Sequence, residues 1–231
     1  GHPVPVRSRG PAPGPPPGSL ERRLLERALR DYRRSGVDKS EAVRTRIRAL
    51  ADELVKVGQR FDVNIAGDTR SIVIEEGVAG LAGLPADFVA AHAPDARGAV
   101  TVTTRPPDLL PFMSYAVRAD LRRALHAEYL NRAHPKNMEV LRELLAKRHE
   151  LAGLLGYACW ADYATEDKMV KSAAAARAFI EEVAARARPR MQAEYAELLE
   201  EKRQDEPEAE VVHGWELAYY TERVKRRRFG L

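Results

Sequence analysis

His149 and Glu150 are the residues whose types and order could take part in metal chemistry. In a zinc-peptidase helix, the pattern His-Glu-x-x-His places two imidazoles one turn apart on one face, and the glutamate acts as general base toward the metal-bound water. The second imidazole would fall one turn after His149, where this chain has Gly153. The pair therefore matches only half of the zinc-site pattern. We predict neither residue to be a metal ligand or a catalytic group.

The other histidines and the single cysteine complete no site either. The inverted pattern His-x-x-Glu-His fails after His213 and Glu216, because Leu217 follows, and His126 has no histidine at ligand spacing. For Cys159 the sequence suggests no activating base, so we expect a buried, inert thiol. We therefore predict no catalytic and no metal-binding residue in this chain, and its substrate-binding residues stay unknown.

Two basic clusters offer a different chemistry, the binding of phosphate groups. The first consists of Arg22, Arg23, Arg27, Arg30, Arg33 and Arg34. Glu21, Glu26 and Asp31 alternate with these arginines at helical spacing, which favours an ion-paired, solvated helix face. The second cluster, KRRR at 225–228, could be a phosphate patch or a nuclear signal. Cations are favoured at a helix C-terminus, so an exposed helix end is the preferred interpretation.

Composition limits the class of protein. The 231 residues are 45% hydrophobic and 31% charged, which is typical of a helix-rich globular chain. Since 38 basic residues face 34 acidic ones, the net charge of +4 argues against a nucleic-acid partner. One cysteine, no apolar run long enough for a bilayer and no signal-peptide pattern predict a cytoplasmic protein without a membrane partner. The first residue is Gly1 rather than Met, so we expect a processed or partial chain.

The order of elements predicts a mainly α fold. Proline and glycine dominate residues 1–18, for which we expect a disordered tail, or else a Pro-x-x-Pro ligand for an SH3-like partner. Helices are expected at 19–36, from 38 or 40 to 61, at 114–132, at 137–156, from 172 onward, and after an acidic loop at 200–210. The β-branched runs 71–76 and 99–104 should pair as one small ribbon, which Pro106 and Pro107 end.

Five segments, in order, carry a resemblance to a known family. They are FDVNIAGDTRSIVI (61–74), LAGLPADFV (81–89), VTVTTRPPDLLPFM (100–113), NRAHPKNMEVLRELLAKRHELAGLLGYACWADYATEDKM (131–169) and HGWELAYYTERVKRRRFGL (213–231). The set resembles the thimet oligopeptidase, oligopeptidase A and peptidyl-dipeptidase family of zinc metallopeptidases over roughly residues 20–231. No single segment is specific, but their order is.

The resemblance implies a neurolysin-like fold of antiparallel helices, whose two lobes enclose a channel for short peptides. It also implies hydrolysis of peptide bonds by a zinc-activated water. The family's His-Glu-x-x-His helix, third ligand and later Tyr and His all follow the Trp-acid-x-x-Tyr-Tyr segment. We therefore expect residues 19–231 to be a helical part that precedes the zinc-binding region, with no catalytic zinc bound by this chain.

Two functions stay open. The first is a partial zinc metallo-oligopeptidase, a fragment that supplies part of the channel wall, is inactive alone and has the missing catalytic portion as a possible partner. The alternative is a non-catalytic helical module that binds peptides or a partner protein, with an exposed apolar surface where that partner docks.

Overall fold

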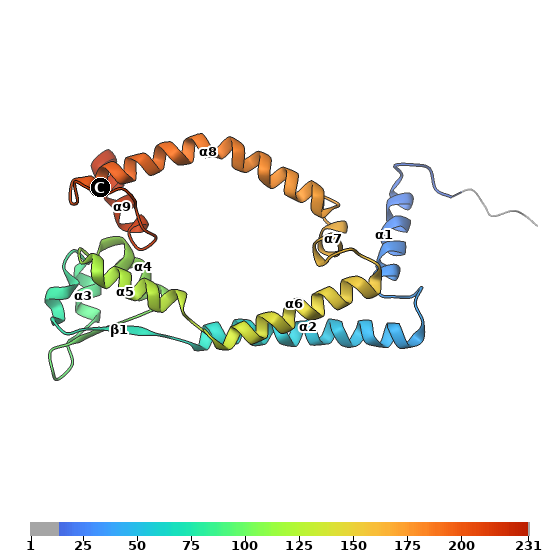
Figure 1. Cartoon of the computed structure of the whole chain (residues 1–231), viewed down its shortest axis with the longest axis horizontal. Helices are drawn as coiled ribbons and strands as arrows, with labels where there is room; N and C mark the ends of the chain where they lie inside the picture. The colour runs from blue at the N-terminus through green and yellow to red at the C-terminus, as the bar shows by residue number, and fades with distance from the viewer. Residues whose placement is uncertain (1–13, 231) are drawn as a thin grey trace, which may run out of the picture.

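The computed structural model describes residues 14–230, and it is mainly helical with one two-stranded ribbon, as the sequence predicts (Figure 1). Residues 1–13 of the predicted tail lie outside the described residues. The elements are α1 (Leu20–Arg34), α2 (Glu41–Gly67), β1 (Ser71–Ile74), a short 3-10 helix η1 (Gly77–Leu81), α3 (Ala86–Ala91), β2 (Val100–Thr103), α4 (Pro106–Tyr115), α5 (Ala119–Leu130), α6 (Lys136–Leu155), α7 (Trp160–Glu166), α8 (Ala173–Arg203) and α9 (Leu217–Phe229). Within residues 14–230, none of the helices has the length and apolarity that a membrane span requires.

Helices α2 and α6 form an antiparallel hairpin with its own small core (Figure 1). The core consists of Ile47, Leu50 and Leu151, and it is flanked by Trp160 at the start of α7. These α2 positions recur at intervals of three and four residues, so they share the face that packs on α6. The hairpin is the framework from which α1 and α7 extend.

The ribbon anchors a second, larger core. β1 and β2 are antiparallel, with Ser71 opposite Thr103 and Ile74 opposite Val100. Alternate side chains of a strand point to opposite faces, and Val100 and Val102 are buried while Thr101 is exposed. The inward face is covered by residues of η1, α3, α4 and α5, among them Leu81, Phe88, Phe112 and Leu125. Trp215 and Ala218, next to and within α9, complete this core.

Helix α8 spans the distance between the two cores (Figure 1). It contacts α7 at its start and α9 at its end. Between these contacts, residues 177–194 are exposed at every position. The Ser172 side chain caps the helix by accepting from the Ala175 N–H, and the exposed span carries two ion pairs at four-residue spacing, Arg186–Glu182 and Arg190–Glu194. Local interactions therefore help to hold the middle of α8 helical.

Several boundaries differ from the prediction. α2 continues past Phe61 to Gly67, because the side chain of Asn137 donates to the Phe61 carbonyl and accepts from Asn64. The helix expected from 137 begins at Lys136, and Asn137 connects α6 to α2. Gly156 ends α6 in the left-handed conformation, as predicted.

Three segments expected to be irregular are helical. Pro106 and Pro107 begin α4 rather than a turn, since the first helical positions need no backbone N–H partner. The segment after Gly156, for which no helix was expected, contains α7. Separately, the expected helix 114–132 is divided between α4 and α5. The expected acidic loop begins later than predicted, because α8 continues to Arg203.

The hairpin core yields a stability prediction. Leu50 is fully buried against α6, whereas Leu145 on α6 is 53% exposed. Leu50→Ala should lower the free energy of unfolding in urea by about 2–5 kcal/mol, because the lost apolar contacts leave a cavity. Leu145→Ala is the matched control and should change it by no more than about 0.5 kcal/mol. Equal effects of the two substitutions would show that this hairpin core does not form.

Candidate functional site

The half-motif His149–Glu150 lies on an exposed part of α6. The Glu150 carboxylate accepts two hydrogen bonds from Arg46 of α2, at 2.6 Å from Nε and 2.7 Å from Nη2. These hydrogen bonds lower the pKa of Glu150 below its usual value, which keeps the carboxylate ionised and occupied. Glu150 therefore joins α2 to α6, and its geometry differs from that of a general base aimed at a metal-bound water.

The acidic residue of the Trp-acid-x-x-Tyr-Tyr segment, Glu216, forms a buried ion pair with α8. Glu216, directly before α9, is 3% exposed, and Lys202 near the end of α8 is 4% exposed. The Lys202 ammonium donates to both Glu216 oxygens at 2.8 and 2.7 Å, and to the Val211 carbonyl at 3.1 Å. Glu216 also accepts from the His213 backbone N–H at 2.8 Å. With its oxygens satisfied, Glu216 ties α8 to α9.

Two histidines flank Trp215 in the same segment. The exposed His213 ring stacks on Trp215 with ring centres 4.3 Å apart, and the half-buried His126 of α5 meets the same indole edge-on at 6.5 Å. Arg123 lies 5.2 Å from the centre of the Trp215 ring. This cluster combines an aromatic surface with hydrogen-bonding groups at a half-exposed position.

Arg122 is a buried cation that the sequence analysis missed. It is 1% exposed, donates to the Ala116 and Val117 carbonyls, and lies 4.0 Å from the centre of the Tyr219 ring. Burial lowers the pKa of Arg122. Only its place among apolar positions of a helix could have indicated that it faces the core.

The other candidate residues have structural surroundings. Cys159 is exposed, so the prediction of a buried thiol is wrong: it lies at the N-cap of α7 with its sulfur 3.3 Å from Asp162, while Trp160 packs inward instead. The 225–228 cluster is the exposed end of α9, as predicted. Its Arg227 and Arg228 pair with carboxylates of α8, at 2.6 Å to Glu201 and 2.7 Å to Glu197.

A metal site needs several His, Cys, Asp or Glu side chains close together. Within residues 14–230, no three His, Cys, Asp or Glu side chains are grouped so that they could hold a metal ion.

The comparisons with known proteins give the class. The sequence profile described as peptidase family M3 matches residues 112–231, which is more than half of the chain. Oligopeptidase A of Salmonella typhimurium is 29% identical over 228 residues, covering 92% of this chain and 33% of the relative. A probable thimet oligopeptidase of Arabidopsis thaliana is 27% identical (90% of this chain, 29% of the relative), and a mitochondrial intermediate peptidase of Chaetomium globosum is 28% identical (89% and 26%).

The chain belongs to peptidase family M3, a family of zinc metallopeptidases. This confirms the family inferred from the five segments. The chain spans about a third of the length of the curated relatives that it matches first.

The buried pair yields the second prediction. Glu216→Gln removes the buried counter-charge of the Lys202 ammonium and leaves it only the exposed Glu206 carboxylate at 3.4 Å, so it should lower the free energy of unfolding by about 3–5 kcal/mol. The control, Glu182→Gln, breaks the exposed pair with Arg186 and should cost less than about 1 kcal/mol. Urea unfolding of both variants checks this.

The double variant Lys202→Met, Glu216→Leu removes both charges and should regain most of the lost stability, since no unpaired charge remains buried. A Glu216→Gln variant as stable as the control would contradict the assignment of this pair as the connection between α8 and α9.

Proposed function

We propose that this chain supplies part of the helical channel wall of a zinc-dependent oligopeptidase and does not hydrolyse peptides by itself. The observation that carries the proposal is the family match over 112–231 together with relatives, oligopeptidase A among them, that align with about nine-tenths of the chain. In this proposal residues 1–18 are a tail, and 19–231 are the helical part that precedes the zinc-binding region. The substrates of the complete enzyme are short peptides, cleaved in the cytoplasm.

The zinc ligands and the general base come, in this proposal, from the part of the relatives' length that the match does not cover. Two features support it: Glu150 is bound by Arg46, and Glu216 is bound by Lys202. Neither carboxylate of the candidate motifs is available to bind a metal or to accept a proton from water. We further propose that neither nucleic acid nor a membrane is a partner.

The exposed residues 177–194 of α8 support the proposal that this part of the channel wall contacts further protein. Phe179 and Ile180 are 62% and 64% exposed, and Val183 and Met191 are also exposed. These four positions fall within a single stripe of the helix, because residues three and four apart share a face. A free-standing helix with an apolar stripe is typical of a surface that another element covers. The partner in this proposal is the zinc-bearing portion of the enzyme.

The alternative is a non-catalytic module that binds a peptide or a partner on the same surfaces. The cluster of Trp215, His126 and His213 favours this alternative, because an aromatic surface can bind a peptide without cleaving it. The two functions differ in one measurable property, which is turnover.

The decisive test measures zinc content and peptide cleavage in the purified 231-residue chain. We expect substoichiometric zinc by elemental analysis and no chelator-sensitive cleavage of a fluorogenic short peptide, with complete oligopeptidase A as positive control. The coding sequence that follows in frame should then contain His-Glu-x-x-His, and the extended chain should bind zinc and cleave the peptide. Stoichiometric zinc with cleavage by the 231 residues alone would refute the proposal. An extended chain that binds the peptide without turnover would favour the alternative.

The α8 stripe yields a separate prediction. At micromolar concentrations the 231-residue chain should self-associate in analytical ultracentrifugation, because the stripe has no apolar cover. Phe179→Glu with Ile180→Glu should reduce that association, since burying a charge without a partner is costly. The matched control, Val55→Glu with Val63→Glu, adds the same charge at exposed apolar positions of α2 and should leave the association unchanged. A strictly monomeric wild-type chain would contradict this role of α8.

A further inference from the structure

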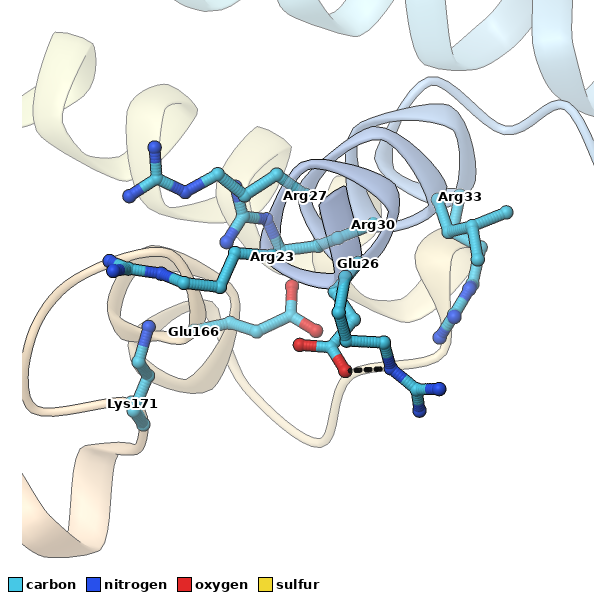
Figure 2. Close-up of a pocket in the computed structure, with 9 residues that line it drawn as sticks. Arg23, Glu26, Arg27, Arg30, Arg33, Glu166 and Lys171 are labelled. Atoms are coloured by element: carbon cyan, nitrogen blue, oxygen red, sulfur yellow. Dashed lines mark hydrogen bonds and ion pairs between the residues drawn. The ribbon is translucent and has the colours of Figure 1, made fainter. Parts of the chain in front are cut away.

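A strongly basic cavity lies between α1 and the segment that joins α7 to α8 (Figure 2). Its volume is about 450 Å³. The charged side chains that line it are Arg22, Arg23, Arg27, Arg30, Arg33 and Lys171, together with Glu26 and Glu166. Six cations thus face two carboxylates in one concave region.

The two carboxylates are already engaged. Glu26 is paired with Arg22 at 2.8 Å, on the same helix. Glu166 is paired with Arg34 at 3.2 Å and also accepts from the Tyr157 hydroxyl. Their charges are therefore largely balanced by partners of their own.

Most of the remaining cations have no such partner. Arg30 is paired with Asp31 at 3.1 Å. Among residues 14–230, no carboxylate lies within ion-pair distance of Arg23, Arg27, Arg33 or Lys171. The predicted ion-paired face of this helix is thus only partly formed, and a local excess of positive charge remains.

The geometry concentrates this excess on one side of α1. Arg23 and Arg27 are one helical turn apart and extend to the same side of the helix, with Arg23 nearer to Lys171, whereas Arg33 lies on the other side of the helix (Figure 2). Like charges at this spacing repel one another in the absence of an anion. The two guanidinium groups and the Lys171 ammonium therefore form the cationic part of the cavity.

The backbone at Lys171 is a second, independent feature. Its φ of 64° lies in the left-handed region, which is uncommon for residues other than glycine. α8 begins two residues later, so the positive end of a long helix dipole lies beside the same cavity. The helix dipole adds to the attraction for negative charge.

We propose that this cavity binds the phosphate chain of a small molecule, as a free polyphosphate or as a nucleoside di- or triphosphate. A carboxylate carries one charge and can be satisfied by a single arginine, whereas a short phosphate chain carries several charges and matches a cavity lined by several cations. Bound there, the ligand would join α1 to the segment before α8. α1, which the structure describes in full, has no buried residue and is held on this side by Arg34, so the ligand would stabilise its position.

The test is isothermal titration calorimetry of the full chain in about 0.1 M salt, where screening acts beyond about 10 Å. The probes are sodium tripolyphosphate and ATP, both without divalent metal. Arg23→Gln with Arg27→Gln should weaken the binding of both probes by at least about tenfold, since two charge-assisted hydrogen bonds are lost. The control, Arg186→Gln with Arg190→Gln in the exposed middle of α8, removes the same net charge and should change the affinity by less than about twofold.

Circular dichroism of both double variants checks that they remain folded, and neither substitution removes a buried group. Four outcomes would overturn the proposal: no binding by the wild-type chain, equal weakening in both variants, binding of ATP but not of tripolyphosphate, or equally tight binding of hexaglutamate. The third would assign recognition to the base, and the fourth to carboxylates. The readout is binding alone, so the result is independent of peptidase activity.

Discussion

The buried ion pair between Lys202 and Glu216 determines where the last third of the chain lies. Two opposite charges removed from water require each other, because either one alone would be buried without compensation. The pair fixes the end of α8 against the start of α9, where Trp215 and Ala218 pack on the ribbon core. The chain leaves the hairpin core through α7 and returns to the ribbon core through α9. This pair, together with the ion pairs that Arg223, Arg227 and Arg228 of α9 make with carboxylates at the end of α8, closes the path between the two apolar cores.

That closure explains how α8 can be exposed along its middle. A helix gains most of its stability in proteins from packing, but one longer than about 15 residues can persist when its composition favours it. α8 is rich in alanine, is capped by Ser172, carries internal ion pairs and is fixed at both ends. Its apolar stripe is therefore not needed for the core of the described residues. The stripe is exposed and can pack against another protein surface. The chain aligns with about a third of the length of the relative.

The features that could be predicted from the sequence are those decided locally. The helices expected from 19 and from 172 begin there, because Ser19 and Ser172 cap them and a cap depends on a few neighbouring residues. The ribbon was predictable from two β-branched runs, and the family from the order of five segments.

The features that were missed depend on contacts between distant parts of the chain. α4 begins with two prolines and is stabilised by the Asp108 carboxylate, which accepts from the Thr103 backbone N–H at 3.0 Å. Lys202 lies in a stretch so rich in charge that a solvated loop was the reasonable prediction. Its burial depends on its counter-charge Glu216 and on the Val211 carbonyl, both of which follow the acidic loop. For Cys159, the neighbouring Trp160 takes the inward position instead.

The basic cavity shows why the net charge of a chain is a poor guide to a local site. The +4 total argued against a nucleic-acid partner, and the alternating charges of α1 favoured an ion-paired face, yet the total sums charges spread over the whole molecule. At physiological salt, a ligand responds to charges within about 8–10 Å of itself. Within that range, Glu26 and Glu166 are balanced by Arg22 and Arg34, and the cations of α1 facing Lys171 are not. An anion in the cavity is attracted by the positive charge that ion pairs leave unbalanced nearby. That local charge can be determined only from the three-dimensional structure.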